Sequence, residues 1–429
     1  MLKKCLVALV ACASFLGARS AVAEQVKFDQ GVDVKAIVQS LQAKVAQETA
    51  AEKAGMANWT VMVYINAKNN LEKYGLLDLN EMEKVGSTDK VKIAVELGRI
   101  KGYDSSDGNW LGQRRYIVAK DADMGKIASP VLQDIPKADM GDYKHLVDFV
   151  AWAKKAAPAQ KYMLIVWNHG SGWDKNIRKA DVVINGISYD DETGNHISTP
   201  QLGQAMASIG KVDIYASDAC LMAMAEVAYQ IKDNTDYVVG AEEVEPGDGY
   251  TYDDFLAPLA PKPGMSALEL SRVTSKAFTA HYAAQGEAAT QSAVQSATLG
   301  KLATMITDWA GAVMTANEAA VVKAAHAQVQ EFYTSDNKDL LHFIELVDAA
   351  SQNAAVKSKG AALEKFLAND VIVANDVTGD SMANAKGLAV YLPSWSFNAK
   401  YNELAWAKAT NWSQFAQWVK GLKSDVAVR

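Results

Sequence analysis

Residues 211–222 read KVDIYASDACLM, and this stretch decides how the rest of the chain is interpreted. Apolar residues stand at alternate positions over 212–216, which is typical of a short, largely buried strand. From Leu221 on, the apolar spacing becomes helical, so Cys220 is predicted to lie where a strand gives way to a helix. Unpaired amides and the helix dipole at such a junction favour a thiolate over a thiol. Cys220, with the acidic Asp218 two residues before it, is therefore the leading candidate for chemistry.

The start of the chain has the features of a secretory signal peptide. Two lysines precede an apolar stretch over residues 5–16, and Ala23 ends a small-residue cleavage site. The apolar stretch is too short to span a membrane. A lipoprotein signal at Cys12 is the rival interpretation, but its apolar region would be unusually short. We therefore expect residues 1–23 to be removed and the mature protein to be secreted or periplasmic.

The chain has three cysteines, and two of them, Cys5 and Cys12, lie in the predicted signal peptide. Cleavage leaves Cys220 alone, which excludes a disulfide framework within the mature chain. A single thiol in a secreted protein indicates a partner or a chemical role for that thiol. The alternative is a packed, inert cysteine, since Cys also behaves as a small hydrophobic residue.

The charge balance restricts the partners of the protein. Lysine and arginine number 43 against 50 aspartate and glutamate residues, which gives a formal net charge of −7. An acidic chain without a basic block argues against nucleic acid and against an anionic membrane surface as partners.

From Trp59 the pattern alternates strands and helices. Strands are predicted over 61–65, 91–97, 115–119 and 162–167, and helices over 71–85 and, after a cap at Asp142, over 143–152. Such alternation predicts an α/β fold with a mostly parallel sheet that is flanked by helices on both faces.

The domain organisation follows from the same patterns. Residues 24–58 are predicted to form an N-terminal arm with one amphipathic helix over 33–45, and a stand-alone spacer is the alternative. Residues 59–290 are predicted to form the α/β core. Residues 291–429 form a helix-rich C-terminal region, in which Trp406, Trp412, Phe415 and Trp418 are interpreted as core aromatics. Ser266 is predicted to cap a long helix, after a break over 258–264, and a strand is expected over 294–299.

Two loops follow the most apolar strands. After YMLIVW comes NHGSGW, which contains His169, and after KVDIY comes SDAC, which contains Cys220. If the two strands are parallel neighbours, both side chains emerge at the same edge of the sheet, where ligands of such sheets bind. A base within reach of a thiol is what nucleophilic catalysis requires. Gly170 permits close approach of the backbone and can offer an amide to an oxyanion.

The other histidines are weaker candidates. His196 lies in a polar loop and is the only serious rival to His169, whereas the remaining ones (His145, His281, His326, His342) lie in helical patterns. No metal site is predicted, because the chain has no HExxH motif and no paired cysteines. The acidic loop over 189–192 could hold calcium, but it lacks the EF-hand spacing.

The order of these motifs resembles the clostripain family of cysteine peptidases, which are relatives of caspases, legumains and gingipains. The matching segments are WTVMVYINAKNNLE, the NHGSGW and SDAC loops after their strands, GISYDD before STPQL, GAEEVEPGDGYTYDDFL and GLAVYLP. The resemblance extends over about residues 59–419. The arm before Trp59 has no counterpart in it, and whether that arm is inhibitory stays open.

The resemblance implies a caspase-like sheet and roles for particular residues. Cys220 would be the nucleophile, His169 its partner, and the amides of Gly170 and Cys220 the oxyanion hole. Asp218 would lie at the floor of a pocket for Arg or Lys before the cut bond, and its alternative role is a helix N-cap. Aspartate specificity is not transferred, because the caspase cysteine signature is QAC-type. Calcium is associated with some members, but no ligand set is assigned here.

The resemblance also implies processing between the two motifs. The stretch WDKNIRKAD over 173–181 is polar and is expected to be an exposed loop, where nicking concentrates. Its basic residues (Lys175, Arg178, Lys179) are the candidate sites of self-cleavage, with Arg178 or Lys179 favoured.

Two functions follow from these observations. The first is a secreted cysteine endopeptidase that cleaves proteins or peptides after Arg or Lys through an acyl-enzyme, without a cofactor and without stable insertion into a membrane. The second is a secreted, non-catalytic α/β binding protein related to such peptidases, in which Cys220 is only packed.

Overall fold

The structure is a computed structural model that describes residues 38–40, 42–43, 56–173, 177–179, 182–184 and 186–424. The chain divides into two units, Met1–Gly55 and Met56–Arg429. In the first unit the described residues are helical, within the helix predicted for the arm. The predicted signal peptide lies outside the described residues.

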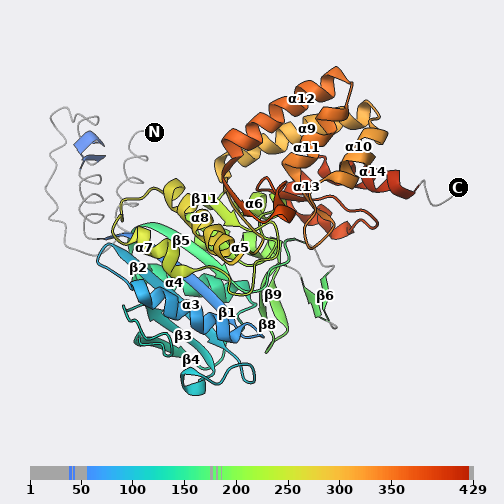
Figure 1. Ribbon diagram of the computed structural model, residues 1–429. Helices are drawn as coiled ribbons and strands as arrows, with labels where there is room; N and C mark the ends of the chain where they lie inside the picture. The colour runs from blue at the N-terminus through green and yellow to red at the C-terminus, as the bar shows by residue number, and fades with distance from the viewer. Residues whose placement is uncertain are drawn as a thin grey trace, which may run out of the picture. The chain divides into compact units, whose positions relative to one another are not determined.

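The second unit is built on a nine-stranded sheet with the order β14-β12-β11-β10-β5-β1-β2-β3-β4. Figure 1 labels β11, β5, β1, β2, β3 and β4 of this sheet. Five central strands are parallel: β1 (Ala57–Ala67), β2 (Val91–Arg99), β5 (Ala159–Trp167), β10 (Val212–Asp218) and β11 (Thr235–Gly240). Four antiparallel strands flank them: β3 (Gly112–Ile117), β4 (Val131–Ile135), β12 (Ala289–Gln295) and β14 (Ile372–Thr378). The predicted mostly parallel sheet is confirmed.

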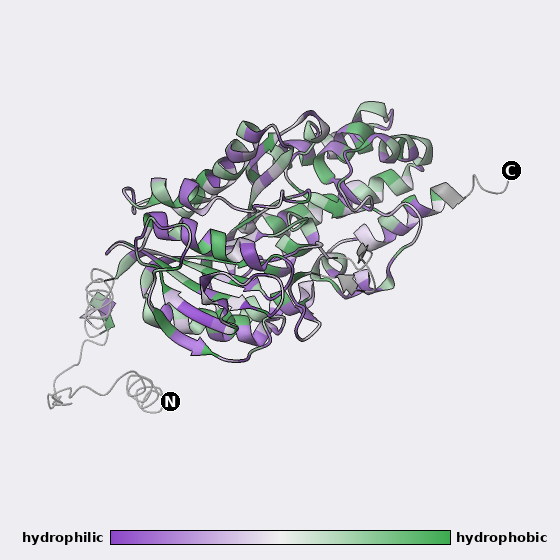
Figure 2. Ribbon diagram, turned by 60° about the horizontal axis from the view of Figure 1, so that its bottom comes forward, coloured by the Kyte–Doolittle hydropathy of each residue, from purple (hydrophilic) through white to green (hydrophobic). Residues whose placement is uncertain are grey.

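Helices cover both faces of this sheet. One face packs against α3 (Glu72–Val85), α7 (Tyr252–Leu259) and α8 (Ala267–Gln285). The other packs against α4 (Tyr143–Ala156), α5 (Thr199–Ile209) and α6 (Ala225–Ile231). Side chains of β1 alternate between the two cores, so Val63 packs with α3 and Tyr64 with α4. Both faces of the central strands therefore carry apolar side chains. Figure 2 colours the ribbon by residue hydropathy, with hydrophobic residues in green.

The C-terminal region continues one of these cores. It contains α9 (Leu299–Thr315), α10 (Ala319–Gln328), α11 (Leu340–Ala350), α12 (Ala354–Phe366), α13 (Ala405–Ala409), α14 (Trp412–Ser424) and a ribbon of β13 (Asn337–Asp339) with β15 (Ala389–Tyr391). Trp406, Trp412 and Phe415 are fully buried, which confirms them as core aromatics, and Trp418 is partly buried against the same core.

The predicted helix caps are also confirmed. Asp142 accepts a hydrogen bond from the Lys144 amide at the start of α4. Ser266 and Glu269 form a reciprocal capping box at the start of α8. Caps are local in sequence, so they can be identified without knowledge of the fold.

Some predicted boundaries are wrong. The strand expected over 115–119 is β3, which begins at Gly112 and ends at Ile117. The strand expected over 294–299 is β12, which begins at Ala289 and ends at Gln295, where a 3₁₀ turn follows. Pro258 lies in the last turn of α7, so the break in the chain comes after Leu259.

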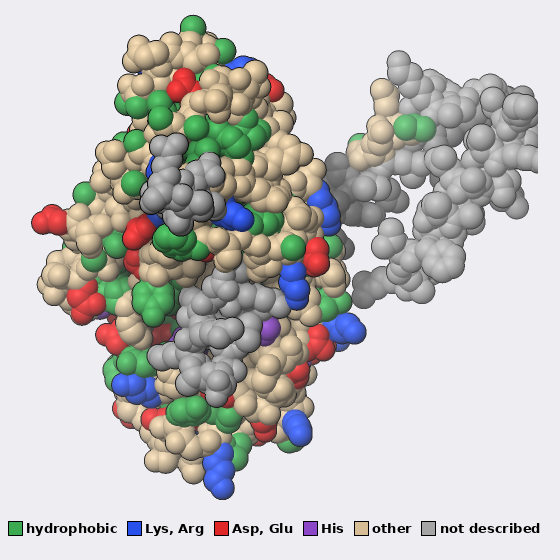
Figure 3. Space-filling view, turned by 90° about the vertical axis from the view of Figure 1, so that its right-hand side faces the viewer, with side chains coloured by type: hydrophobic (Ala, Val, Ile, Leu, Met, Phe, Trp, Pro, Cys, Tyr) green, Lys and Arg blue, Asp and Glu red, His purple; other side chains and the backbone are tan. Residues whose placement is uncertain are grey.

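The surface agrees with an acidic chain of mixed charge. On the face shown in Figure 3, Lys and Arg side chains are interspersed with Asp and Glu side chains. In the described part of the chain, no helix has the length and apolar character needed to cross a bilayer.

Candidate active site

The register of two central strands places the His169 and Cys220 loops side by side. β10 and β5 are parallel neighbours in which Asp218 is paired with Trp167. The Asn168 amide donates to the Asp218 carbonyl over 3.1 Å, which continues the pairing beyond the strand ends. His169 and Cys220 consequently line one cavity of about 680 Å³, as the sequence predicts.

Gly170 brings the two loops into direct contact. A Cβ atom at this position would lie 2.4 Å from the Cys220 carbonyl oxygen and 2.9 Å from the Ala219 Cβ. Backbone atoms cannot move aside as flexible side chains do, so only glycine fits here. The close backbone approach expected of Gly170 is therefore present.

The segment after Cys220 differs from the prediction. Residues 221–224 do not form a helix, and α6 begins only at Ala225. The Leu221 amide donates to the Glu243 carbonyl and the Ala223 amide to the Ala241 carbonyl, so this segment pairs with the chain that follows β11. Leu221 has a φ of 64°, a left-handed conformation that is unfavourable for leucine and redirects the backbone directly after Cys220.

The prediction of a thiolate stabilised by a helix dipole is also wrong. Burial raises the pKa of the Cys220 thiol to about 12, and the negative charge of the neighbouring Glu245 adds to this effect. The raised pKa therefore favours the protonated thiol at neutral pH.

His169 has a partner that was not singled out in the sequence. Its Nε2 atom lies 2.9 Å from Oδ1 of Asn70, in the loop between β1 and α3. An amide oxygen only accepts, so Nε2 carries the hydrogen and the lone pair of the neutral ring is on Nδ1. Asn70 follows the carboxyl end of a parallel strand, and the rule that pointed to His169 and Cys220 points to it as well.

A hairpin of β8 (Ile187–Asp190) and β9 (Asn195–Ile197) forms another wall of the cavity. The Tyr189 carbonyl accepts hydrogen bonds from the side-chain amides of Asn69 (2.9 Å) and Asn168 (3.1 Å). The Tyr189 amide donates to Oδ1 of Asn168 over 2.9 Å. Tyr189 and Asp191 of this hairpin face the cavity.

The rival histidine, His196, lies on this hairpin but outside the cavity lining. Its ring stacks on Tyr189 with centroids 5.2 Å apart. The other histidines lie elsewhere: His145 contacts Glu96, His281 is near Asp254, His326 contacts the Leu392 carbonyl, and His342 accepts from the Gln330 amide. Among the described histidines, His169 alone lines the cavity with Cys220.

Asp218 lines the cavity and is almost fully buried, with 3% of its surface exposed. Its Oδ2 atom accepts from the Tyr252 hydroxyl (2.8 Å) and its Oδ1 atom from the Tyr250 amide (3.1 Å). Burial raises the pKa of this carboxyl. The alternative role of Asp218 as a helix N-cap is excluded, because the residue that precedes α6 is Met224.

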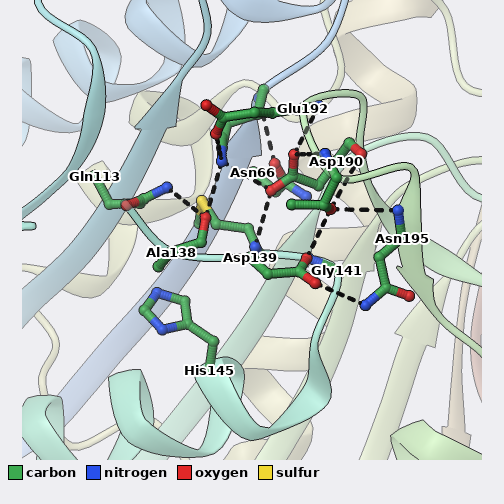
Figure 4. Close-up of polar contacts among 12 residues, drawn as sticks. Asn66, Gln113, Ala138, Asp139, Gly141, His145, Asp190, Glu192 and Asn195 are labelled. Carbon is green, nitrogen blue, oxygen red and sulfur yellow. Dashed lines mark hydrogen bonds and ion pairs between the residues drawn. The ribbon is translucent and has the colours of Figure 1, made fainter. Parts of the chain in front are cut away.

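The acidic loop considered for calcium carries an internal cation. Figure 4 shows Asp190 and Glu192 within a polar network, and the Lys68 ammonium group forms ion pairs with both carboxylates. Lys68 also donates to the Ala138 carbonyl over 2.9 Å. Among the described residues, no group of three or more His, Cys, Asp or Glu side chains is arranged to hold a metal.

The candidate cleavage segment is only partly described. Lys175 lies outside the described residues. Arg178 and Lys179 belong to β6 (Ile177–Lys179), which pairs with β7 (Val182–Ile184) in a two-stranded ribbon. At these two residues the backbone is therefore paired, whereas an unpaired loop was expected.

The sequence and the fold were compared with known proteins. The model of the clostripain family matches residues 63–424. Clostripain of Hathewaya histolytica is 34% identical over 230 residues, which are 45% of this chain and 40% of that protein. The chain thus matches less than half of the length of this relative.

Two solved structures share the fold. One is a secreted C11 cysteine protease from Bacteroides thetaiotaomicron in complex with an irreversible peptide inhibitor, with a TM-score of 0.63, 19% identity and coverage of 83% of this chain and 99% of that one. The other is an inactive zymogen C11 protease from Parabacteroides distasonis. Its TM-score is 0.63 and its identity 19%, and the match covers 83% of this chain and 98% of that one. Because the family model extends from β1 to α14 and both structures share the fold, the chain belongs to the clostripain family of cysteine peptidases.

Proposed function

We propose that the protein is a cysteine endopeptidase in which Cys220 is the nucleophile and His169 the general base and acid. The observation that carries this proposal is the pairing of Asp218 with Trp167, which brings both loops to one cavity. Family membership supports the same assignment. A thiol and an imidazole that line one cavity are the groups that acyl transfer requires.

The reaction begins with a protonated thiol. His169 accepts the Cys220 proton as the sulfur attacks the scissile carbonyl, since the raised pKa of the thiol disfavours a standing thiolate. The amides of Gly170 and Cys220 stabilise the oxyanion. His169 then donates the proton to the leaving amine, and the acyl-enzyme is hydrolysed by a water molecule that His169 deprotonates. Asn70 orients the imidazole throughout.

The proposed substrates have Arg or Lys before the cut bond. Asp218 supports this preference because its carboxyl is buried in the wall of the same cavity as Cys220. A buried carboxyl with no cation beside it favours a ligand that brings one.

A non-catalytic binding protein is the second candidate, and the raised pKa of the Cys220 thiol is the observation that favours it. Hydrolysis of a peptide library by the purified mature protein separates the two functions. The peptidase predicts cleavage after Arg and Lys, no cleavage by Cys220→Ala, and loss of the basic preference in Asp218→Asn. Cleavage by Cys220→Ala at the wild-type rate would exclude the proposed nucleophile, and no cleavage by the wild type would favour the binding protein.

The proposal extends to the site of action. We infer that the protein acts outside the cytoplasm after cleavage near Ala23, since its sequence begins like a secretory signal and one structural relative is described as secreted. Residues 24–58, 59–290 and 291–429 remain the proposed arm, core and C-terminal region. Edman sequencing of the exported protein tests the first boundary, and a start at Cys12 with an attached lipid would contradict it.

Self-processing at Lys175, Arg178 or Lys179 is also proposed. The segment lies between His169 and Cys220 in the chain and presents the basic residues that the site is expected to recognise. Another family member is described as an inactive zymogen, which fits a need for processing. Intact-mass measurement should find two fragments in the wild type and one uncut chain in Cys220→Ala. An active wild type that stays uncut would contradict the idea.

We further propose that the β8–β9 hairpin keeps its conformation without calcium. Lys68 lies between the two carboxylates that a calcium ion would need there. Peptidase activity should then be unchanged after dialysis against EGTA. A loss that added calcium restores would place a calcium site in this protein.

A further inference from the structure

Glu245 is a buried acid in the active-site cavity for which the sequence alone indicates no role. It follows β11, lines the cavity with Asp218 and Cys220, and is 8% exposed. Its Oε1 atom is buried and accepts no N–H or O–H among the described residues. A buried carboxyl in this state needs a proton or a cation.

Glu245 and the pocket acid Asp218 line the same cavity. Burial raises the pKa of both carboxyls, and the charge of Asp218 raises that of Glu245 further, which favours a pair that holds one proton. Both Asp218 oxygens also accept bonds from the 250–252 segment, so the pair is held from two sides. With one proton the pair carries a single negative charge, which matches one guanidinium or ammonium group.

Glu245 and Cys220 line the same cavity. Burial raises the pKa of the Cys220 thiol most, and the charge of the Glu245 carboxylate raises it further. Glu245 therefore links the charge in the pocket to the ionisation of the Cys220 thiol.

The surroundings do not neutralise this pair. The titratable groups that interact with this pair or line the cavity beside it are acids and phenols: Asp78 of α3, Asp248, Tyr250, Tyr252 of α7 and Tyr282 of α8. Gln291 of β12 is also adjacent to Glu245. No lysine or arginine is found among the described residues that line the cavity. The missing cation can come from the substrate.

We propose that Glu245 couples the occupation of the pocket by a basic side chain to the reactivity of Cys220. The cation binds the Asp218–Glu245 pair, which keeps its single proton, and the net charge of the pair with its ligand falls from −1 to zero. The negative charge of the pair then no longer opposes ionisation of the Cys220 thiol. Binding of a basic substrate therefore makes Cys220 more reactive. This inference rests on the proposed function, because it assigns the pocket to a basic side chain.

The test measures thiol reactivity without turnover. The full mature protein is alkylated with iodoacetamide over a range of pH, and the modified fraction is followed by intact mass. Ethylguanidinium fills the pocket with a cation, and N-ethylurea, at matched ionic strength, serves as the neutral control. The expected result is a labelling midpoint lowered by about one pH unit with the cation, or roughly tenfold faster labelling below the midpoint, and no shift with the urea.

Variants assign the effect to Glu245. Glu245→Gln leaves the single negative charge on Asp218, which opposes ionisation of the Cys220 thiol less than Glu245 does. Its labelling midpoint without ligand should therefore be lower than that of the wild type, and ethylguanidinium should lower it further by about half a pH unit or less. Glu287→Gln, at an exposed acid outside the cavity, should behave as the wild type. An equal response of the wild type to both ligands would overturn the coupling, and this comparison does not depend on how well any variant folds. If ethylguanidinium lowers the labelling midpoint of Glu245→Gln as far as that of the wild type, the proposed role of Glu245 is contradicted.

The same preparation separates this inference from the proposed function. If arginine peptides are hydrolysed but ethylguanidinium does not shift the labelling midpoint, the peptidase function is supported and the coupling is contradicted. If no peptide is hydrolysed but the labelling midpoint shifts as expected, the peptidase function is contradicted and the coupling between the pocket and the thiol is supported.

Discussion

Asp218 and Trp167 are paired across the adjacent parallel strands β10 and β5, and this pairing determines the geometry of the site. Two residues beyond each of them stand Cys220 and His169, which line one cavity. A shift of the pairing by one residue would turn every side chain of a strand to the other face. The register of the two strands therefore brings Cys220, the proposed nucleophile, and His169, its proposed base, to one cavity.

Gly170→Ala should lower kcat/KM by about a hundredfold or more, because the added methyl group meets the Cys220 backbone and separates the two loops. The fold should persist, since the change is confined to loops. Gly264→Ala is the matched control, as no atom lies within 4 Å of its Cβ position. Wild-type activity in Gly170→Ala, measured with an arginine peptide, would show that the close approach is not needed.

Asn70→Ala should lower kcat by about 10- to 100-fold with little change in KM, because His169 loses the group that orients its ring. Asn70→Asp should move the acidic limb of the pH–rate profile upward, since a carboxylate beside the imidazole favours its protonated form. A profile identical to that of the wild type in both variants would remove Asn70 from the mechanism. Asn369→Ala, at an exposed helical position, is the control.

Glu226 should make the stability of the protein depend on pH. It is fully buried and accepts from the Tyr401 hydroxyl and the Tyr391 amide, and burial raises its pKa from 4.5 to about 7. Between these two values the folded protein binds more protons than the unfolded chain, so stability falls as pH rises from about 4.5 to 7 and stays low above.

Glu226→Gln removes this titration. The difference in unfolding free energy between pH 5 and pH 8, measured by urea denaturation, should shrink by on the order of 2–3 kcal/mol relative to the wild type. An unchanged difference would show that Glu226 is already ionised in the folded protein.

Lys68→Met should destabilise the protein by about 3–5 kcal/mol, because it leaves the buried Asp190 carboxylate without its cation. The double variant Lys68→Met/Asp190→Asn should regain part of this loss. Lys211→Met breaks an exposed ion pair with Asp236 and should cost less than about 1 kcal/mol. Equal effects of the two single substitutions on urea unfolding would contradict the role of Lys68.

Much of this site could be predicted because its main signal is local. The strands before His169 and Cys220 are continuous apolar runs, and buried parallel strands bring the loops at their carboxyl ends to one edge of the sheet. The caps at Asp142 and Ser266 depend on residues only two or three positions away, so they too were predictable.

The turn after Cys220 could not be predicted for the opposite reason. Its apolar residues have helical spacing, yet they are held by backbone bonds to residues 241–243, and the sequence does not reveal that pairing. Asn70 and His169 are hydrogen-bonded although they are 99 residues apart in the chain. Likewise, only the folded chain brings Lys68 into its ion pair with Asp190. The effect of Glu245 on the thiol likewise depends on a contact that only the folded chain creates.

The most direct test of the central claim is to trap the nucleophile. The mature protein is incubated with an irreversible peptidyl acyloxymethyl ketone that ends in arginine, and the modified residue is located by peptide mass spectrometry. We predict a single adduct on Cys220, slow modification by the reagent that ends in aspartate, and no adduct in Cys220→Ala or, on the same time scale, in His169→Ala. An adduct on another residue, or equal labelling by the aspartate reagent, would contradict the proposed site.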